Sequence, residues 1–301
     1  MIEQNKPVTK AVIAAAGFGT RFLPQTKAMP KEMLPLIDKP IIQYVVEELV
    51  AAGIKDIIIV GSSNKRSIED HFDMPSQDLL ANLEAGGETK RHYIDEIQAI
   101  GNLANFIYVR QKGPYGNGTP LLNAAHLIGN EPFIYTWADD FIQATPSRFK
   151  QMINVYNQLQ GPIVSCIKVT DDEEYNRYGI VSGTVLEGRP EVLRMDKIVE
   201  KPGKNNAPSD MASVSGYLLT NDIITYLEQA AAAHDSNGEL YVQTAMQTMI
   251  EEGYPYYALQ VQNGKYYDTG NKLEYIKTVI DFALERPDMR DEVLAHLRSR
   301  V

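Results

Sequence analysis

Cysteine is almost absent from this sequence, and histidine is sparse. Cys166 is the single cysteine among 301 residues, which excludes an internal disulfide framework and any zinc site built on paired cysteines. It stands in an apolar run, where we expect a small buried side chain. The five histidines show no metal-binding spacing, and no Gly-x-Ser-x-Gly nucleophile motif occurs. Covalent catalysis therefore has no visible candidate.

Long hydrophobic runs and positive charge are also scarce. No apolar segment approaches the roughly 20 residues that cross a bilayer, and the polar residues 1–10 do not resemble a signal peptide. We therefore expect a cytoplasmic protein without a membrane partner. The 29 lysines and arginines are outnumbered by 39 aspartates and glutamates, which gives a net charge of −10. A chain this acidic is a poor general binder of nucleic acid, because duplex affinity depends on neutralising phosphates.

The first half of the chain alternates between short apolar runs and segments with helical spacing. This alternation predicts a doubly wound parallel sheet with right-handed crossovers. The predicted strands are residues 10–16, 56–61, 105–109 and 132–137, and the predicted helices are about 40–52, 65–72, 76–99 and 119–128.

After residue 161 the strands follow one another without intervening helices. Strands at 163–169, 178–186, 192–199 and 212–219 predict an antiparallel or mixed part of the sheet; helices at 221–233 and 239–252, a strand near 256–262 and a last helix at 291–299 follow. Leu273, Ile276, Ile280 and Ala283 form one more helical stripe. We expect a single domain, 1–301, in which one continuous sheet extends from a first half (about 8–160) into a substrate-binding half (about 161–285), followed by a C-terminal helix (287–301).

A glycine loop, residues 17–24, follows the first predicted strand. Its two glycines would let backbone amides approach an anion closely. The dinucleotide fingerprint is absent because Phe22 stands at its third glycine position, and no Gly-Lys-Ser/Thr of a Walker A loop follows. Arg21 and Lys31 add two cations beside the loop, which favours a polyphosphate ligand. Each cation alone could equally be a solvated surface charge.

Acidic residues stand at three further places, two of which follow or end a predicted strand. Asp139 and Asp140 follow the fourth predicted strand, and adjacent carboxylates there suit Mg²⁺; a helix cap or turn is the alternative. Asp268 is a candidate second ligand or simply the start of a turn. Glu200 and Lys201 precede a proline, and an exposed ion pair is their alternative interpretation.

The motifs together resemble a known family. Gly17-x-Gly19-Thr20-Arg21-x-x-Pro24-x-Thr26, followed by Pro30-Lys31-Glu32-Met33-Leu34-Pro35, is similar to the signature loop of sugar-1-phosphate nucleotidylyltransferases. Residues 64–73, residues 109–112 and the triplet Glu200-Lys201-Pro202 resemble the bacterial UTP–glucose-1-phosphate uridylyltransferases. The resemblance extends from about Lys10 to Ile280.

This resemblance implies an α/β fold, a Rossmann-like (glycosyltransferase-A-like) mixed sheet flanked by helices. It also implies that the half at about 8–160 binds the nucleotide and the half at about 161–285 binds the sugar phosphate. It implies that UTP and glucose 1-phosphate react with Mg²⁺ to give UDP-glucose and diphosphate, in a homodimer or homotetramer. Catalytic positions would be Arg21, Lys31 and Lys201, and metal ligands Asp139 and Asp268. Nucleotide-binding positions would be Ala15, Ala16, Gly17, Gly19, Thr20, Gln111 and Gly116, and sugar-binding positions Asp140, Gly179 and Glu200.

The chain departs from the family pattern near the base and the sugar. Residues 114–119 read Pro-Tyr-Gly-Asn-Gly-Thr where Pro-Leu-Gly-Leu-Gly-His is common, and residues 238–244 read Gly-Glu-Leu-Tyr-Val-Gln-Thr where Gly-Glu-Ile-Gln-Leu-Thr-Asp is common. The alternatives are therefore dTTP or another hexose 1-phosphate, or a catalytically silent sensor of nucleotide sugars. The retained cations and Asp139 count against the sensor, and Phe22 counts against a nicotinamide dehydrogenase.

Overall fold

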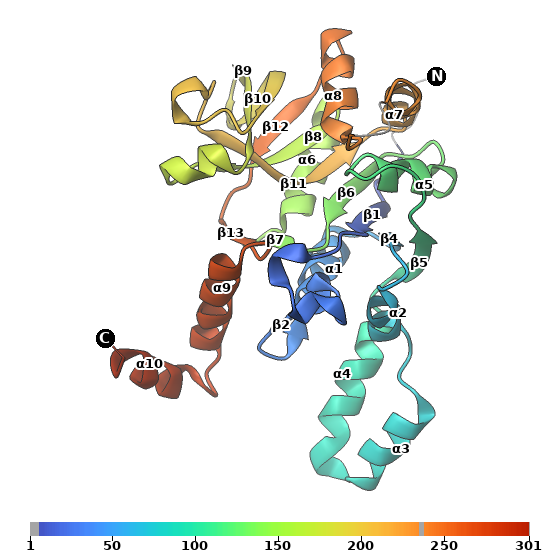
Figure 1. The fold of residues 1–301 in the computed structure, drawn as a ribbon, viewed down its shortest axis with the longest axis vertical. Coiled ribbons are helices and arrows are strands. Elements are labelled where there is room, and N and C mark those ends of the chain that lie inside the picture. The colour runs from blue at the N-terminus through green and yellow to red at the C-terminus, as the bar shows by residue number, and fades with distance from the viewer. Residues whose placement is uncertain (1–5, 235–237, 301) are drawn as a thin grey trace.

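The computed structural model describes residues 6–234 and 238–300, and one sheet runs through its centre (Figure 1). This nine-stranded sheet has the order β5-β4-β1-β6-β11-β8-β12-β10-β9. Its strands are β1 (Lys10–Ala15), β4 (Asp56–Gly61), β5 (Asn105–Arg110), β6 (Phe133–Trp137), β8 (Ile163–Lys168), β9 (Gly179–Leu186), β10 (Arg189–Glu200), β11 (Met211–Leu219) and β12 (Tyr257–Gln260). Two small sheets pair β2 (Pro35–Leu36) with β3 (Lys39–Pro40) and β7 (Asp140–Ala144) with β13 (Gly264–Asp268).

Helices cover both faces of the sheet. They are α1 (Ile41–Ala52), α2 (Arg66–Phe72), α3 (Gln77–Ala85), α4 (Arg91–Gly101), α5 (Thr119–Ile128), α6 (Arg148–Leu159), α7 (Asp222–Ala232), α8 (Val242–Glu251), α9 (Lys272–Glu285) and α10 (Arg290–Arg298). Successive side chains of β1 point to opposite faces: Ile13 packs in the core that holds α1 and α6, and Val12 in the core that holds α5, α7 and α8. The predicted mixed sheet flanked by helices is confirmed.

The parallel half follows the predicted doubly wound order. The chain enters at β1, moves outward through β4 to β5, and then returns to place β6 on the other side of β1, with all four strands parallel. Parallel strands end at the same edge of a sheet, so the loops that follow β1, β5 and β6 meet there. This edge holds the candidate site.

The second half is mixed, as the strand spacing predicts. β11 pairs antiparallel with β6 and with β8, and β12 lies parallel to β8 and antiparallel to β10. Because β11 is hydrogen-bonded to β6, the two halves share one continuous sheet. Cys166, on β8, is fully buried as expected. Within residues 6–234 and 238–300, no helix has the length and apolarity needed to cross a membrane.

Several details differ from the sequence-based expectations. The helix expected at 76–99 is divided into α3 and α4, because two glycines interrupt it and Gly87 adopts a φ of +68°. Helix α6 and the β7–β13 ribbon have no predicted counterpart, and α8 begins at Val242 rather than at 239. The apolar stripe of α9 is only partly covered, since Leu273 and Ile276 are exposed; in Figure 1, α9 and α10 extend away from the sheet.

Candidate functional site

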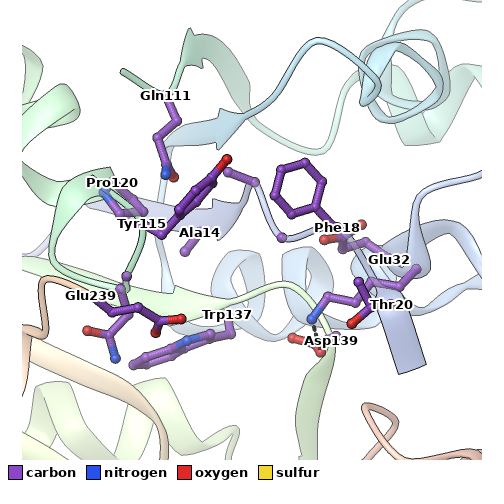
Figure 2. Close-up of a pocket in the computed structure, with 15 residues that line it drawn as sticks. Ala14, Phe18, Thr20, Glu32, Gln111, Tyr115, Pro120, Trp137, Asp139 and Glu239 are labelled. Carbon is purple, nitrogen blue, oxygen red and sulfur yellow. Dashed lines mark hydrogen bonds and ion pairs between the residues drawn. The ribbon is translucent and has the colours of Figure 1, made fainter. Parts of the chain in front are cut away.

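A pocket of about 450 Å³ opens at the edge where β1, β5 and β6 end (Figure 2). The glycine loop, Gln111, the loop of residues 114–120, and Trp137 with Asp139 line it. A larger hollow of about 1000 Å³ shares Phe18 and Tyr115 with this pocket. Seven of the predicted site residues line the pocket: Ala16, Gly17, Thr20, Lys31, Gln111, Gly116 and Asp139.

Lys31 and Asp139 form an ion pair at one end of the pocket. The Lys31 Nζ lies 2.5 Å from Asp139 Oδ2, as the dashed line in Figure 2 shows. Burial lowers the pKa of Lys31, but the charges of Asp139 and Glu32 outweigh this effect, so the net pKa is raised. Lys31 is therefore a fixed cation beside a carboxylate.

Asp268 and Arg21 lie next to Asp139 around Gly270, although neither of them lines the pocket itself. A methyl group placed on Gly270 would lie 3.2 Å from Asp268 Oδ1 and 3.3 Å from Asp139 Oδ2, so the two carboxylates flank the same position. Arg21 Nη1 donates to the Gly270 carbonyl oxygen at 3.4 Å. Burial raises the pKa of Asp268; the Gly270 amide opposes this shift, and the charge of Asp139 adds to it. Two anions and two cations thus meet here.

The carboxylate oxygens around Gly270 suit a divalent cation such as Mg²⁺, provided that a bound ligand supplies some of the oxygens that coordinate it. No group of three or more histidine, cysteine, aspartate or glutamate side chains is placed to hold a metal in the described part of the chain. Mg²⁺ is commonly held by one or two carboxylates, with waters and substrate phosphates filling its other positions. Asp139 and Asp268 provide two such carboxylates.

Buried contacts hold the glycine loop in place beneath the pocket. Lys65 Nζ donates to the Gly17 carbonyl oxygen at 2.7 Å and to both oxygens of Glu32, at 2.7 and 3.0 Å. Both side chains are buried, 3% and 1% exposed. Burial raises the pKa of Glu32, and the charges of Lys65 and Lys31 oppose the shift. Sequence analysis missed this pair, although both residues stand inside the motifs that carry the family resemblance.

The 114–120 loop is docked against residue 240, on the segment that leads into α8. Gly118 N donates to the Leu240 carbonyl oxygen at 2.8 Å, and Leu240 N donates to the Tyr115 carbonyl oxygen at 2.7 Å. Gly116 has a φ of +120°, and a Cβ there would lie 2.2 Å from the Leu240 oxygen. Only glycine can occupy this position.

Two exposed aromatic rings, which sequence analysis also missed, stand at the pocket. Phe18 and Tyr115 pack edge to face with 5.7 Å between ring centroids, and Figure 2 shows them side by side. Both are more than half exposed. Large exposed apolar side chains that converge on a pocket are typical of ligand sites. An aromatic residue inside each of two glycine-containing loops is the sequence feature that could have indicated them.

The predicted sugar-side residues gather at the end of the β9–β10 hairpin. Gly179 pairs with Glu200, and a Cβ on Gly179 would lie 3.1 Å from Glu200 Oε2. Lys201 Nζ lies 3.6 Å from Glu200 Oε1, and both side chains are exposed. These three residues do not line the 450 Å³ pocket. Tyr178, which sequence analysis did not select, connects the two places because its hydroxyl donates to Asp268 Oδ2 at 3.2 Å.

Asp140 lies behind Asp139, among protein donors. Its carboxylate accepts hydrogen bonds from the Ser215 hydroxyl and, at 3.2 Å, from the Tyr266 hydroxyl. The fully buried Arg148 lies 3.7 Å away. Burial raises the pKa of Asp140 to about 8; Arg148 opposes the shift, and the charges of Asp139 and Asp268 add to it. Asp140, together with Ala15 and Gly19, is outside the pocket lining, and its contact with a sugar stays a prediction.

Comparison with known proteins shows which family this chain resembles in sequence and fold. The family model described as nucleotidyl transferase matches residues 10–283. A UTP–glucose-1-phosphate uridylyltransferase of Bacillus subtilis is 42% identical over 98% of this chain and 97% of its own. Two solved structures have the same fold. A UTP-bound UGPase from Acinetobacter baumannii is 33% identical, with a TM-score of 0.83, and the match covers 96% of this chain and 98% of that chain. A UDP-glucose pyrophosphorylase complexed with UDP-glucose is 38% identical, with a TM-score of 0.80, and the match covers 93% of this chain and 100% of that chain. The chain therefore belongs to the nucleotidyl transferase family, and within it to the UTP–glucose-1-phosphate uridylyltransferases.

Proposed function

We propose that this chain transfers a uridylyl group, converting UTP and α-D-glucose 1-phosphate into UDP-glucose and diphosphate. The observation that carries the proposal is the group of opposite charges beside the pocket, where Asp139, Asp268 and Arg21 surround Gly270 and Lys31 pairs with Asp139. The names of the relatives at 41–43% identity support the same reaction.

The reaction needs no protein base or nucleophile. An oxygen of the sugar phosphate, already ionised at neutral pH, attacks the α-phosphorus of UTP; a P–O bond forms to it, and the bond to the β-phosphate oxygen breaks to release diphosphate. Catalysis then depends on in-line positioning and on neutralising two polyanions. Lys31 and Arg21 are placed to bind the triphosphate, and Lys201 would contact the sugar phosphate. A net charge of −10 is compatible with this chemistry, because the local field decides what binds.

We propose that Asp139 and Asp268 hold Mg²⁺ in this site. The metal, when bound, supplies positive charge to the phosphate oxygens that the two carboxylates cannot supply. Lys31, already beside Asp139, keeps a protein cation at the same place.

We further propose that Gln111 and Gly116 contact the base, and that Glu200 and Gly179 contact glucose hydroxyls. The hydrogen bond from Tyr178 to Asp268 supports the second assignment, because it ties the end of the β9–β10 hairpin to the metal site. We also expect a cytoplasmic homodimer or homotetramer, and the exposed Leu273 and Ile276 of α9 are consistent with a covered face in such an assembly.

Diphosphate release tests the proposed reaction directly. The purified protein is incubated with Mg²⁺ and glucose 1-phosphate, and UTP, dTTP, ATP, CTP and GTP are compared. We expect a clear preference for UTP. Preference for dTTP would keep the mechanism and change the base, a candidate favoured by the altered 114–120 loop. No release with any nucleotide or hexose 1-phosphate, combined with UTP binding in calorimetry, would favour the silent sensor.

A further inference from the structure

We infer that Gln243, in the first turn of α8, is a positioning residue. It fixes the 114–120 loop, which we propose contacts the base, and so sets the affinity and selectivity for UTP. The inference rests on the proposed function, because it concerns how the same pocket recognises its nucleotide. Gln243 does not line that pocket. It acts through Asn117, which does.

Both ends of the Gln243 amide form hydrogen bonds, each to a different part of the structure. Its Oε1 accepts from Asn117 Nδ2 at 3.0 Å, and its Nε2 donates to the Tyr217 hydroxyl at 3.2 Å. Asn117 belongs to the 114–120 loop, and Tyr217 belongs to β11. One side chain therefore joins the loop to the central sheet.

Asn117 has little freedom once these contacts form. Its Oδ1 accepts from Val242 N at 2.8 Å, and its carbonyl oxygen accepts from the Tyr135 hydroxyl. Residues 115 and 118 on either side are hydrogen-bonded to Leu240. The whole loop is thus attached to the segment 240–243, and Gln243 supplies the side-chain contact that fixes the Asn117 amide nitrogen, beside the backbone contact from Val242 N to its oxygen.

The second bond of Gln243 reaches another wall of the pocket. Tyr217 packs edge-on against Trp137, with 5.3 Å between centroids and an angle of 89°. Trp137 lines the pocket and is the single tryptophan of the chain. Gln243 therefore holds Asn117 on one wall and, through Tyr217, supports Trp137 on another.

Asn117 and Gln243 are also two of the positions at which this sequence departs from the usual family pattern. Asn117 stands where leucine is common, and Gln243 stands where threonine is common. A leucine side chain can neither donate nor accept a hydrogen bond. The two departures, 126 positions apart, contact each other directly, which indicates that they work as a pair.

The primary test is Gln243→Leu, which replaces the amide with a branched apolar side chain of comparable volume and removes both hydrogen bonds. We expect the KM for UTP to rise roughly threefold to tenfold, the equivalent of about one hydrogen bond, with kcat little changed. The preference for UTP over dTTP should also fall, because a looser loop accommodates the extra methyl group. Titration of Trp137 fluorescence with UTP measures the shift in Kd without turnover.

The matched control is Gln247→Leu, one turn further along α8. The Gln247 amide donates only to Glu251, at 3.0 Å, so its loss should change neither KM nor Kd. A double-mutant cycle tests the contact between the two residues. Asn117→Ala should raise the Kd for UTP. Adding Gln243→Leu to that variant should raise the Kd little further, because Asn117, the hydrogen-bond partner of Gln243, is already absent.

Three outcomes separate the possibilities. Unchanged UTP affinity in Gln243→Leu, or effects that add fully with Asn117→Ala, would overturn the inference while leaving the proposed function intact. If Gln243→Leu does not fold, Tyr217→Phe removes one hydroxyl and should still raise the Kd for UTP; an unchanged Kd would overturn the inference. Absence of both turnover and UTP binding in the unaltered protein would instead overturn the proposed function.

Discussion

Asp139 does two separable things at the residue scale. Its side chain pairs with Lys31, while its carbonyl oxygen accepts from the Thr269 hydroxyl at 2.5 Å. An asparagine would keep the shape and the backbone contact and would remove only the negative charge. The residue therefore allows a test of charge without a change in packing.

We predict that Asp139→Asn lowers turnover by at least roughly a hundredfold, the size of losing one preorganised electrostatic contact. It should also raise the Mg²⁺ concentration needed for half-maximal rate. Rate is measured against Mg²⁺ concentration, and a thermal melt checks the fold. The control is Asp78→Asn on the exposed first turn of α3. A metal response equal to that of the unaltered protein would place the metal on other ligands.

Single residues could be selected from the sequence where a motif marks them, but their contacts could not. Four candidates were selected, and the structure brings them together: Asp139, Asp268 and Arg21 lie around Gly270, and Lys31 pairs with Asp139. The partners Lys31 and Asp139 are 108 positions apart, so no local pattern indicates their contact. Tyr178 was overlooked for the same reason, since its bond to Asp268 depends on how a distant hairpin packs.

At the scale of elements, the 114–120 loop is defined by Gly116. A side chain there meets two obstacles: the left-handed backbone and the Leu240 carbonyl oxygen. Gly188, in the β9–β10 turn, also has a positive φ, +74°, but has open space around it. Substitutions at the two glycines can therefore be compared: both would strain the backbone, but only a side chain at Gly116 would also push the loop away from Leu240.

We predict that Gly116→Ala weakens UTP binding, whereas Gly188→Ala does not. Both should lose about 1 kcal/mol of stability or more from an unfavourable backbone conformation. Only the first should push the loop away from residue 240. Trp137 fluorescence titration and chemical denaturation measure the two effects separately. Normal UTP affinity in Gly116→Ala would mean that the loop can move without affecting the base.

Elements were predictable where apolar periodicity is uninterrupted, as in β1, β4 and α1. Helix α6 shows the opposite case: Phe149, Met152, Ile153 and Tyr156 are buried at helical spacing, but no helix was assigned there. The β7–β13 ribbon depends on pairing across more than 100 positions, which local patterns do not reveal. The α9 stripe was identified as helical, yet its burial depends on what packs against it.

At the scale of the whole molecule, stability should depend on pH through His71. Its Nε2 lies 2.9 Å from Gln43 Oε1, which joins α2 to α1, and burial lowers the pKa of His71 below 6.5. Below that pH the unfolded chain binds a proton that the folded chain resists, so the free energy of unfolding contributed by this group falls as pH falls.

We predict that His71→Gln reduces the loss of stability between pH 7.5 and roughly pH 5.5, a window set by the ordinary histidine pKa. Denaturant unfolding at both pH values measures this difference. His296→Gln, on the exposed α10, should leave it unchanged. An identical pH dependence in all three proteins would show that His71 does not contribute.

The order of strands in the sheet was not predictable from local patterns. The doubly wound half followed from its alternation of strands and helices, because crossover handedness leaves few arrangements. The position of β12 between β8 and β10 follows only from long-range packing. The continuous sheet supports our proposal of one domain with two halves.

That strand order also has a consequence for how the chain is made. The ribosome releases β1, β4, β5 and β6 first, and they can pair with one another as they emerge. β8 follows, but its two neighbours, β11 and β12, arrive much later. Until then β8 is an unpaired edge, which is a site for wrong pairing and aggregation. The sheet is complete only when β12 (Tyr257–Gln260) has been synthesised, late in the chain, so we expect slow folding that ends after synthesis.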